Sequence, residues 1–338
     1  MTADHPLEPQ AGWQHPAQAQ AVETIVRALE KVGALAGYRP EQIFSDWLRL
    51  VESALAALPA HLDHLRQTGQ AVETEAIIDA AIFGQASDQE DRAAYFQHFA
   101  SATRTLLQSV QYGYYDVVGS SYQLYATLNK YTAQFFTPWP VALLMARMTI
   151  IDGETYVLHR LQDAAERGAR ADPDLETLLL SHGLMAALMA DDERQHDVFF
   201  NQLLPALWPY YDPITIADPC LGSGVLLLAA AAMFPRWAIV TGCVQFYGMD
   251  IDPTCVQMAR INFNLYGLSA GQVTVQNALT APDAYMARYP EPYQSVYRAL
   301  RDAQGRGDQA TLRAITADIE AARSGPGPAQ LSLFGGER

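Results

Sequence analysis

The sequence predicts an α/β fold in which a small parallel sheet follows a long helical region. Ile214 to Asp218 is a short apolar run that ends in an acid, and a tight Gly222-Ser223-Gly224 turn and a second apolar stretch follow it. Val244 to Met249 is another β-prone run, and it leads into Asp250. Strand, glycine loop, helix and strand in this order are typical of the opening unit of a nucleotide-binding sheet.

The residues around the glycine turn suit close contact with a ligand. Glycines let the backbone approach a ligand without an intervening side chain, and a helix start offers free N–H groups to a negative group. Asp250, at the end of the second strand, is placed to accept hydrogen bonds from both hydroxyls of a ribose. We expect a helix from Thr254 to Tyr266, closed by Gly267, and a third strand over Val273 to Gln276.

Three segments carry a resemblance to a known family. Asp218-Pro219-Cys220-Leu221-Gly222-Ser223-Gly224 resembles the S-adenosylmethionine loop of adenine-N6 DNA methyltransferases, the kind found as modification subunits of type I restriction-modification systems. Gly248 to Pro253 looks like the ribose-binding segment of that family. Ala133 to Pro138 resembles its Gly-Gln-Phe-Phe-Thr-Pro segment, which packs over the methionine end of the cofactor, although Ala133 replaces the glycine. A generic dinucleotide fold is the alternative.

The resemblance runs from about Ile43 to about Leu279 and is closest to a plasmid- and phage-type branch with a long helical front half. It implies a truncated Rossmann-like methyltransferase sheet with a large helical N-terminal domain, and S-adenosylmethionine as the cofactor. Asn277 stands where the family often has an acid, and its amide oxygen can accept the same hydrogen bond from the cofactor adenine. The cofactor-binding residues that the resemblance implies are Phe136, Thr137, Pro138, Asp218, Pro219, Cys220, Gly222, Ser223, Gly224, Asp250, Ile251, Asn277, Ala278 and Leu279.

The family's target-base motif is not found in the sequence. Adenine-N6 methyltransferases carry Asn/Asp-Pro-Pro-Tyr/Phe after the fourth strand, where it binds the amino group of a flipped adenine and stacks on the base. The nearest match here is Tyr289-Pro290-Glu291-Pro292-Tyr293, and no β-prone run precedes it. We therefore assign no catalytic residue. We expect only three parallel strands, with the glycine-loop strand near an edge that a homodimer, a partner subunit or the helical front half covers.

The chain divides into segments of different character. Ala21, Val22, Ile25, Val26 and Leu29 have the spacing of a buried helical face, and Val141, Leu144, Met145 and Met148 indicate an amphipathic helix further along. The predicted segments are a disordered tail over 1–16, a helical domain over 17–136, a lid and helical insert over 137–213, the cofactor-binding core over 214–282, C-terminal helices over 283–323 and a flexible tail over 324–338.

Two local patterns allow more than one interpretation. Tyr112 to Asp116 either walls the cofactor pocket or forms an aromatic turn between helices. Glu193 and His196 have the Glu-x-x-His spacing of carboxylate-bridged iron sites. Those sites need a second such pair, which the sequence lacks, so we interpret this one as a charged helix start and predict no metal site.

Composition limits the cellular context. The chain has 338 residues, of which 50% are hydrophobic, which is typical of a globular protein. No apolar run reaches membrane-spanning length, and the three cysteines lack metal spacing, so we expect reduced thiols in the cytoplasm and no membrane partner. The formal net charge of −15 opposes simple DNA binding, so DNA is expected as a partner that is reached directly or through another protein.

The C-terminal tail carries a separate motif. Gln330, Leu331, Leu333 and Phe334 follow a Gly- and Pro-rich spacer and resemble the peptide by which bacterial replication and repair proteins dock on the sliding clamp. A tail without function is the alternative. Three functions follow: an adenine-N6 DNA methyltransferase, alone or completed by a partner chain; a relative that binds S-adenosylmethionine without methylating; and an interaction protein that reuses the fold and docks on the clamp.

Overall fold

The chain was described with a computed structural model. It describes residues 15–70, 89–126, 136–184, 193–268 and 270–278, and short pieces at 298–299, 301–302, 306–311 and 313–314. These residues form two compact units. The first comprises the described residues from 15 to 153 and from 216 to 275, and the second comprises those from 154 to 215 and those after 275.

Several predictions concern residues outside the described ranges. They are the first residues of the lid segment (Ala133 to Phe135), the cofactor-binding Leu279, the proline-rich segment Tyr289 to Tyr293 and the clamp-like peptide Gln330 to Phe334. These predictions stay predictions.

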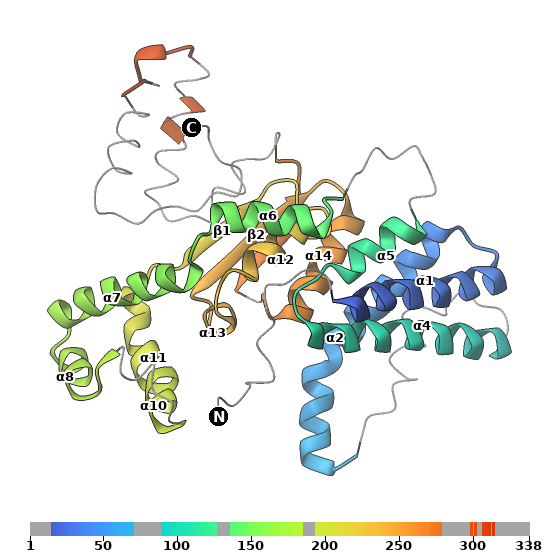
Figure 1. The fold of residues 1–338 in the computed structure, drawn as a ribbon, viewed down its shortest axis with the longest axis horizontal. Helices are drawn as coiled ribbons and strands as arrows, with labels where there is room; N and C mark the ends of the chain where they lie inside the picture. Colours follow the sequence, from blue (N-terminus) through green and yellow to red (C-terminus); the bar gives the residue numbers. More distant parts are fainter. Residues whose placement is uncertain are drawn as a thin grey trace. The chain divides into compact units, whose positions relative to one another are not determined.

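The first unit combines a helical front part with a small sheet (Figure 1). Its helices are α1 (Pro16–Ala36), α2 (Pro40–Thr68), α4 (Gln89–Ser109), η1 (Val110–Tyr112), α5 (Val117–Tyr125), α6 (Trp139–Thr149), α12 (Val225–Ala231), α13 (Arg236–Val240) and α14 (Pro253–Tyr266). Its strands are β1 (Ile214–Asp218), β2 (Val244–Asp250) and β3 (Gly271–Val275), and β1 begins at the boundary with the second unit.

The sheet is parallel and has the strand order β1-β2-β3. This order confirms the predicted α/β class, and it places the glycine-loop strand β1 at an edge among the described strands. The third strand was predicted to begin at Val273, but it begins at Gly271, which pairs with Phe246. A Cβ atom on Gly271 would lie 1.9 Å from the carbonyl oxygen of Phe246, so only glycine fits beside that strand.

One face of the sheet is covered by helices. Phe246 of β2 packs edge-on against Phe263 of α14, with ring centroids 6.4 Å apart, and both side chains are buried. Helix α14 contacts β2, β3 and α12, and α12 in turn contacts α6. The strand residues between the buried ones, such as Gln245 and Tyr247, are half-buried. The alternation shows that the described helices pack mainly against a single face.

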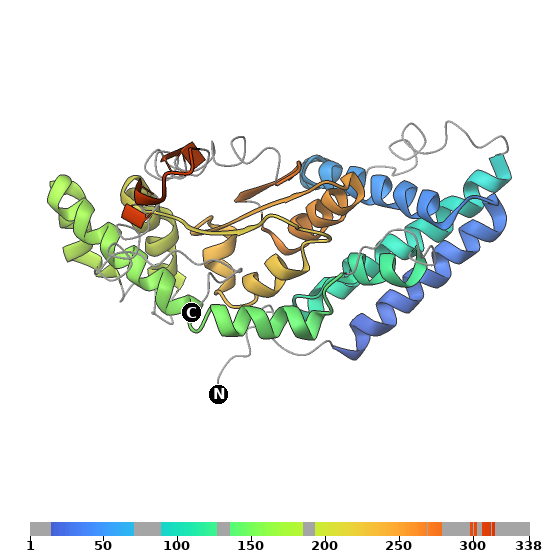
Figure 2. The same ribbon diagram turned by 90° about the horizontal axis from the view of Figure 1, so that it is seen from above.

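The helical front part packs against α14. Helices α1 and α4 lie side by side in both views, and α1 also contacts α2 and α5 (Figures 1 and 2). The predicted apolar face of α1 is confirmed, because Ala21, Val22, Ile25, Val26 and Leu29 are all buried. Helices α2 and α5 contact α14, so the front part reaches the helix that supports the sheet.

The helix boundaries follow local signals. Helix α14 begins after Asp252, whose side chain accepts a hydrogen bond from the Thr254 N–H at 2.8 Å, with Pro253 in the first turn. It ends at Gly267, which has a left-handed φ of 73°. Helix α2 begins at Pro40 and ends before Gly69, which has a left-handed φ of 71°.

The helix α6 was predicted from the spacing of Val141, Leu144, Met145 and Met148. The helix is present, but its buried side carries Trp139, Ala142, Leu143 and Ala146 instead. Val141, Leu144 and Met148 are exposed. The small alanines allow α6 and α12 to approach closely, which a stripe of larger side chains would prevent.

The second unit is helical apart from the start of β1. It contains α7 (Gly153–Ala171), α8 (Pro173–His182), α10 (Glu193–Val198), the π-helical turn η2 (Phe199–Leu203), α11 (Leu204–Leu207) and η3 (Trp208–Tyr210). The Arg167 guanidinium donates to the Asp212 carboxylate at 2.9 Å. A Cβ atom on Gly168 would lie 2.4 Å from Leu175, so this glycine permits the close approach of α7 and α8. His196, from the Glu-x-x-His pair, lies in α10.

Candidate functional site

The glycine loop is held across the carboxyl ends of β1 and β2. The Cys220 N–H donates to Asp218 Oδ1 at 2.9 Å, just after β1 ends. The Leu221 N–H donates to the Met249 carbonyl at 2.9 Å, and the Gly222 N–H donates to Asp250 Oδ2 at 2.8 Å. The loop is therefore anchored to both strands, and the acids that end β1 and β2 lie at the same edge of the sheet.

Two positions in the loop require glycine for conformational reasons. Gly222 has a φ of 54° and Gly224 a φ of 86°, both in the left-handed region that other residues enter at a cost. Added Cβ atoms there would find their nearest neighbours at 3.5 Å and 3.4 Å, so backbone conformation rather than space selects glycine. The predicted role of these glycines, to let a ligand approach the backbone, stays a prediction.

Asp218 is the most perturbed acid of the loop. Its side chain is buried, and its Oδ2 atom has no hydrogen-bond partner in the described part of the chain. Burial raises the pKa of this carboxyl to about 6, the hydrogen bond from Cys220 lowers it, and the nearby negative charge of Asp250 raises it further. A buried carboxylate oxygen without a donor is costly, so the loop holds an acceptor that a bound ligand could satisfy.

Phe136 of the predicted lid lies beside the loop. A Cβ atom built on Gly222 would be 3.5 Å from the Phe136 ring. The ring also packs edge-on against Tyr122 at 5.7 Å, and the Phe136 carbonyl accepts a hydrogen bond from the Gln123 side chain at 3.1 Å. Thr137 is half-buried and Pro138 is exposed. The structure thus brings the end of the lid and the glycine loop together, although they are far apart in the sequence.

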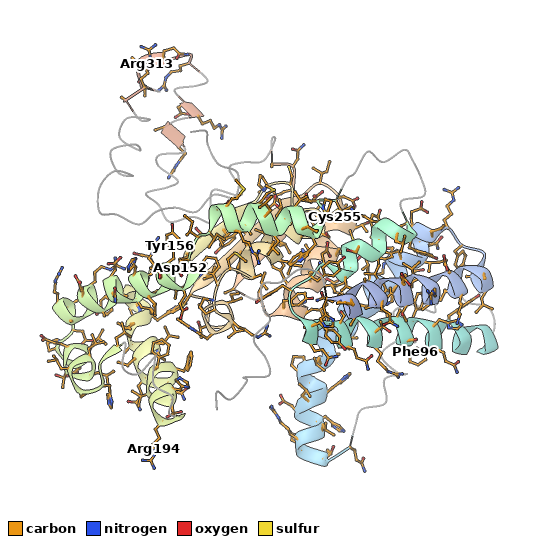
Figure 3. All side chains as sticks on the ribbon, viewed as in Figure 1. Phe96, Asp152, Tyr156, Arg194, Cys255 and Arg313 are labelled. Atoms are coloured by element: carbon orange, nitrogen blue, oxygen red, sulfur yellow. The ribbon has the colours of Figure 1, made fainter. Side chains whose placement is uncertain are left out.

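The cysteines near the site are held as neutral thiols. Cys255, labelled in Figure 3, is buried in the first turns of α14. Burial, together with the charges of Asp250 and Asp252, raises the pKa of its thiol. Burial and the charges of Asp218 and Asp250 likewise raise the pKa of the exposed Cys220. A raised pKa disfavours the thiolate, which is the nucleophilic form of cysteine.

The other described residues that were predicted to bind the cofactor give no further indication of a ligand site. Ile251 and Pro219 are exposed beside the loop. Asn277 is exposed and Ala278 is half-buried, and both belong to the second unit. Their part in a cofactor site stays a prediction.

Sequence reasoning missed two buried polar residues that hold the loop from behind. Asp116, the N-cap residue of α5, and Asn262 of α14 are both buried and both contact Ser223. The segment Tyr112 to Asp116 therefore adjoins the loop and also forms the turn into α5. An asparagine within the apolar face of α14 was the available signal for Asn262. For Asp116, the only signal in the sequence was its place in the aromatic segment Tyr112 to Asp116, and nothing in that segment indicated a contact with Ser223.

Two further structural findings concern other classes of site. Within the described ranges, no group of three or more His, Cys, Asp or Glu side chains is arranged to hold a metal ion. None of the helices in those ranges combines the length and the apolar character needed to cross a bilayer.

Comparison with known proteins identifies the segment that contains the loop. Residues 202–291 match the family model described as N-6 DNA methylase. This range includes β1, β2, β3 and the loop between Asp218 and Gly224. No match is found among curated proteins. The match agrees with the resemblance that the loop and the second strand carry. Over residues 202–291, about a quarter of its 338 residues, the chain is similar to the adenine-N6 DNA methyltransferase family.

Proposed function

We propose that the chain binds S-adenosylmethionine at the glycine loop, on a truncated Rossmann-like methyltransferase sheet. The observation that carries this proposal is the Asp218 carboxyl, which is buried and has an unpaired oxygen beside a loop with two left-handed glycines. Proteins rarely keep such an oxygen without a donor, and a ligand that brings an ammonium and hydroxyl groups supplies several.

The residues of the loop fit this cofactor. S-adenosylmethionine carries donors on its amino group, ribose and adenine, and a positive charge on its sulfur. Asp218 and Asp250 provide two carboxylates at one edge of the sheet, which suits both the donors and the positive charge. Phe136 provides an apolar wall beside Gly222, and Thr137 follows it. Asn277 is proposed to accept from the adenine.

In this proposal, the chain's own residues bind and orient the cofactor. Asp250 accepts hydrogen bonds from the ribose, and Asp218 accepts from a donor on the cofactor with its free oxygen. When bound, S-adenosylmethionine supplies an electrophilic methyl group. The family relationship makes the adenine N6 amino group of DNA the proposed acceptor.

Transfer to DNA also needs a site for the flipped adenine. The printed sequence contains no Asn/Asp-Pro-Pro-Tyr/Phe motif to bind the target amino group. We therefore propose that methylation requires residues from a partner subunit. The same observation favours a second function, in which the chain binds S-adenosylmethionine as a sensor and docks on the sliding clamp through Gln330, Leu331, Leu333 and Phe334.

Isothermal titration with S-adenosylmethionine tests the proposal. We expect saturable binding to the wild-type chain and an affinity lower by about tenfold or more in Asp218→Asn, because a hydrogen bond to a charged group is lost. Asp63→Ala serves as the control, since Asp63 lies on α2 in an exposed pair with Arg66. Absence of binding by the wild-type chain would rule the proposal out. Equal binding by Asp218→Asn would remove Asp218 from the site.

A methyl-transfer assay separates the two functions. The wild-type chain is incubated with labelled S-adenosylmethionine and unmethylated bacterial DNA, alone and with extract from the source cells. Label on adenine only in the presence of extract supports a methyltransferase completed by a partner. Binding without label in either case supports the sensor.

A further inference from the structure

Asp116 is a buried acid outside the glycine loop. It lies at the N-cap of α5, in the helical front part, and only 4% of its surface is exposed. Its Oδ1 accepts hydrogen bonds from the Gly119 N–H at 2.7 Å and from Asn262 Nδ2 at 2.8 Å. Its Oδ2 accepts a short hydrogen bond from the Ser223 hydroxyl. An ordinary helix cap needs only the first of these bonds, so the other two require a separate explanation.

Both additional bonds lead to the glycine loop. Ser223, between the two left-handed glycines, is bound through its hydroxyl by Asp116 and through its carbonyl by Asn262 Nδ2 at 2.9 Å. Asn262 also donates to Asp116, so the cap of α5, the loop and α14 form a closed set of hydrogen bonds. The loop is therefore hydrogen-bonded to the N-cap of α5 and to α14, in addition to its bonds to β1 and β2.

The backbone of Gly119 packs so closely against Asp116 and Ser223 that no side chain fits there. A Cβ atom on Gly119 would lie 2.2 Å from Asp116 Oδ2 and 2.4 Å from Ser223 Oγ. Burial raises the pKa of the Asp116 carboxyl, and the hydrogen bonds from Ser223, Gly119 and Asn262 oppose that shift. A buried carboxyl contributes little to stability compared with an apolar side chain of similar size. The buried Asp116 carboxyl is therefore better explained by the orientation that it gives Ser223 than by a contribution to stability.

We propose that Asp116 is a positioning residue for the cofactor loop, and that it couples cofactor binding at Gly222 and Gly224 to the helical front part of the chain. This inference rests on the proposed function of the loop. By fixing the Ser223 hydroxyl, Asp116 sets the orientation of the peptide groups on either side of Ser223. Loss of the bond frees those peptide groups and weakens the cofactor site.

The test compares two buried serines. Ser223→Ala removes the hydroxyl that Asp116 binds. Ser121→Ala is the matched control, because the Ser121 hydroxyl is also buried but has no hydrogen-bond partner in the described residues. We expect Ser223→Ala to weaken S-adenosylmethionine binding by about tenfold, and Ser121→Ala to leave it unchanged.

A double-mutant cycle identifies the partner of Ser223. Asp116→Ala removes the acceptor of the same bond, so the double variant Asp116→Ala/Ser223→Ala should bind the cofactor no more weakly than the worse single variant. Additive losses would show that the two residues act separately and would overturn the proposal. Binding by Ser223→Ala as tight as that of the wild type would overturn it as well.

Hydrogen exchange of the ligand-free chain keeps this inference separate from the proposed function. The amides of Leu221, Gly222 and Gly224 are hydrogen-bonded to Met249, Asp250 and Leu221. We expect them to exchange about tenfold faster in Ser223→Ala than in Ser121→Ala. If the wild-type chain binds no cofactor, the proposed function fails, and this comparison still decides whether Asp116 positions the loop. Equal exchange in the two variants would contradict the inference.

Discussion

The buried carboxyl of Asp218 makes the stability of the folded chain depend on pH. Its pKa is raised to about 6 by burial, so the folded chain binds a proton on this group more tightly than the unfolded chain does. The stabilisation that accompanies protonation is present at acidic pH and is lost as the pH rises through about 6. A shift of about two pKa units corresponds to about 3 kcal/mol at neutral pH.

Asp218→Asn should therefore change stability in a pH-dependent way. The amide cannot ionise, so we expect the unfolding free energy of the variant, relative to the wild type, to rise by about 2 kcal/mol between about pH 4.5 and about pH 7.5. The rest of the difference of about 3 kcal/mol develops below about pH 4.5, where the unfolded chain also binds the proton. Urea unfolding at the two pH values measures this difference. A relative stability that does not change with pH would show that the Asp218 carboxyl is not perturbed.

Gly222, in the proposed cofactor loop, can be compared with Gly37, which ends helix α1, because both have a left-handed backbone conformation. Gly222 and Gly37 have φ values of 54° and 67°, and a Cβ atom would clash at neither position. We expect Gly222→Ala and Gly37→Ala each to lose about 1 kcal/mol of stability, because both would force alanine into the left-handed region. Only Gly222→Ala should weaken S-adenosylmethionine binding. Thermal unfolding and isothermal titration on both variants test this, and equal binding by the two would contradict it.

At the residue scale, the sequence predicts those site residues whose position follows from the local pattern of a strand and its end. Asp218 and Asp250 were identifiable because each ends a β-prone run, and parallel strands bring their carboxyl ends to one edge. Asp116 and the hydroxyl of Ser223 were not identifiable as partners. Their contact depends on how the helical front part packs against α14, which no local pattern specifies.

At the scale of elements, α14 connects the sheet to the helical front part. The Tyr266 hydroxyl donates to the Tyr115 carbonyl at 2.9 Å and accepts from the Tyr115 N–H at 3.3 Å, and both residues are buried. Tyr266→Phe leaves both backbone groups without this partner. We expect a loss of about 1–3 kcal/mol in unfolding free energy.

Tyr38→Phe provides the control for this measurement. Tyr38 is 46% exposed, so the loss of its hydroxyl should change stability by less than about 0.5 kcal/mol. Denaturant unfolding of both variants compares them directly. A similar, small change in both would show that the bonds between Tyr266 and Tyr115 do not hold α14 to the front part.

Helix α6 and strand β3 show where element prediction fails. The spacing of Val141, Leu144 and Met148 indicated a helix correctly, but these residues are exposed and the side with Ala142 and Ala146 is buried. Close approach of two helices favours small side chains over the most hydrophobic ones. In β3, the sequence did not indicate that the strand includes Gly271, because the need for glycine at this position arises only beside Phe246.

At the scale of the whole molecule, the net charge bears on how the chain would reach DNA. The net charge of −15 leaves few cations for phosphate contacts. We expect the chain alone to bind duplex DNA too weakly to detect at about 200 mM salt, with only weak binding at about 50 mM. Fluorescence anisotropy with labelled DNA measures this. Tight binding with a steep salt dependence would show a local basic surface and contradict the need for a partner.

The small sheet was predictable from the sequence, because only three β-prone runs follow the helical region up to residue 278. The described residues contain three strands, with β1 at an edge. The partner that would complete the site was not predictable, since partner identity depends on surfaces that the sequence pattern does not reveal.

Hydrogen exchange of the wild-type chain with and without S-adenosylmethionine tests the central claim most directly, because it locates the binding site. We predict slower exchange in the presence of the cofactor at the loop from Pro219 to Gly224 and at the end of β2 around Asp250. Unchanged exchange throughout the chain, or protection confined to residues outside the loop and the carboxyl ends of β1 and β2, would contradict the account.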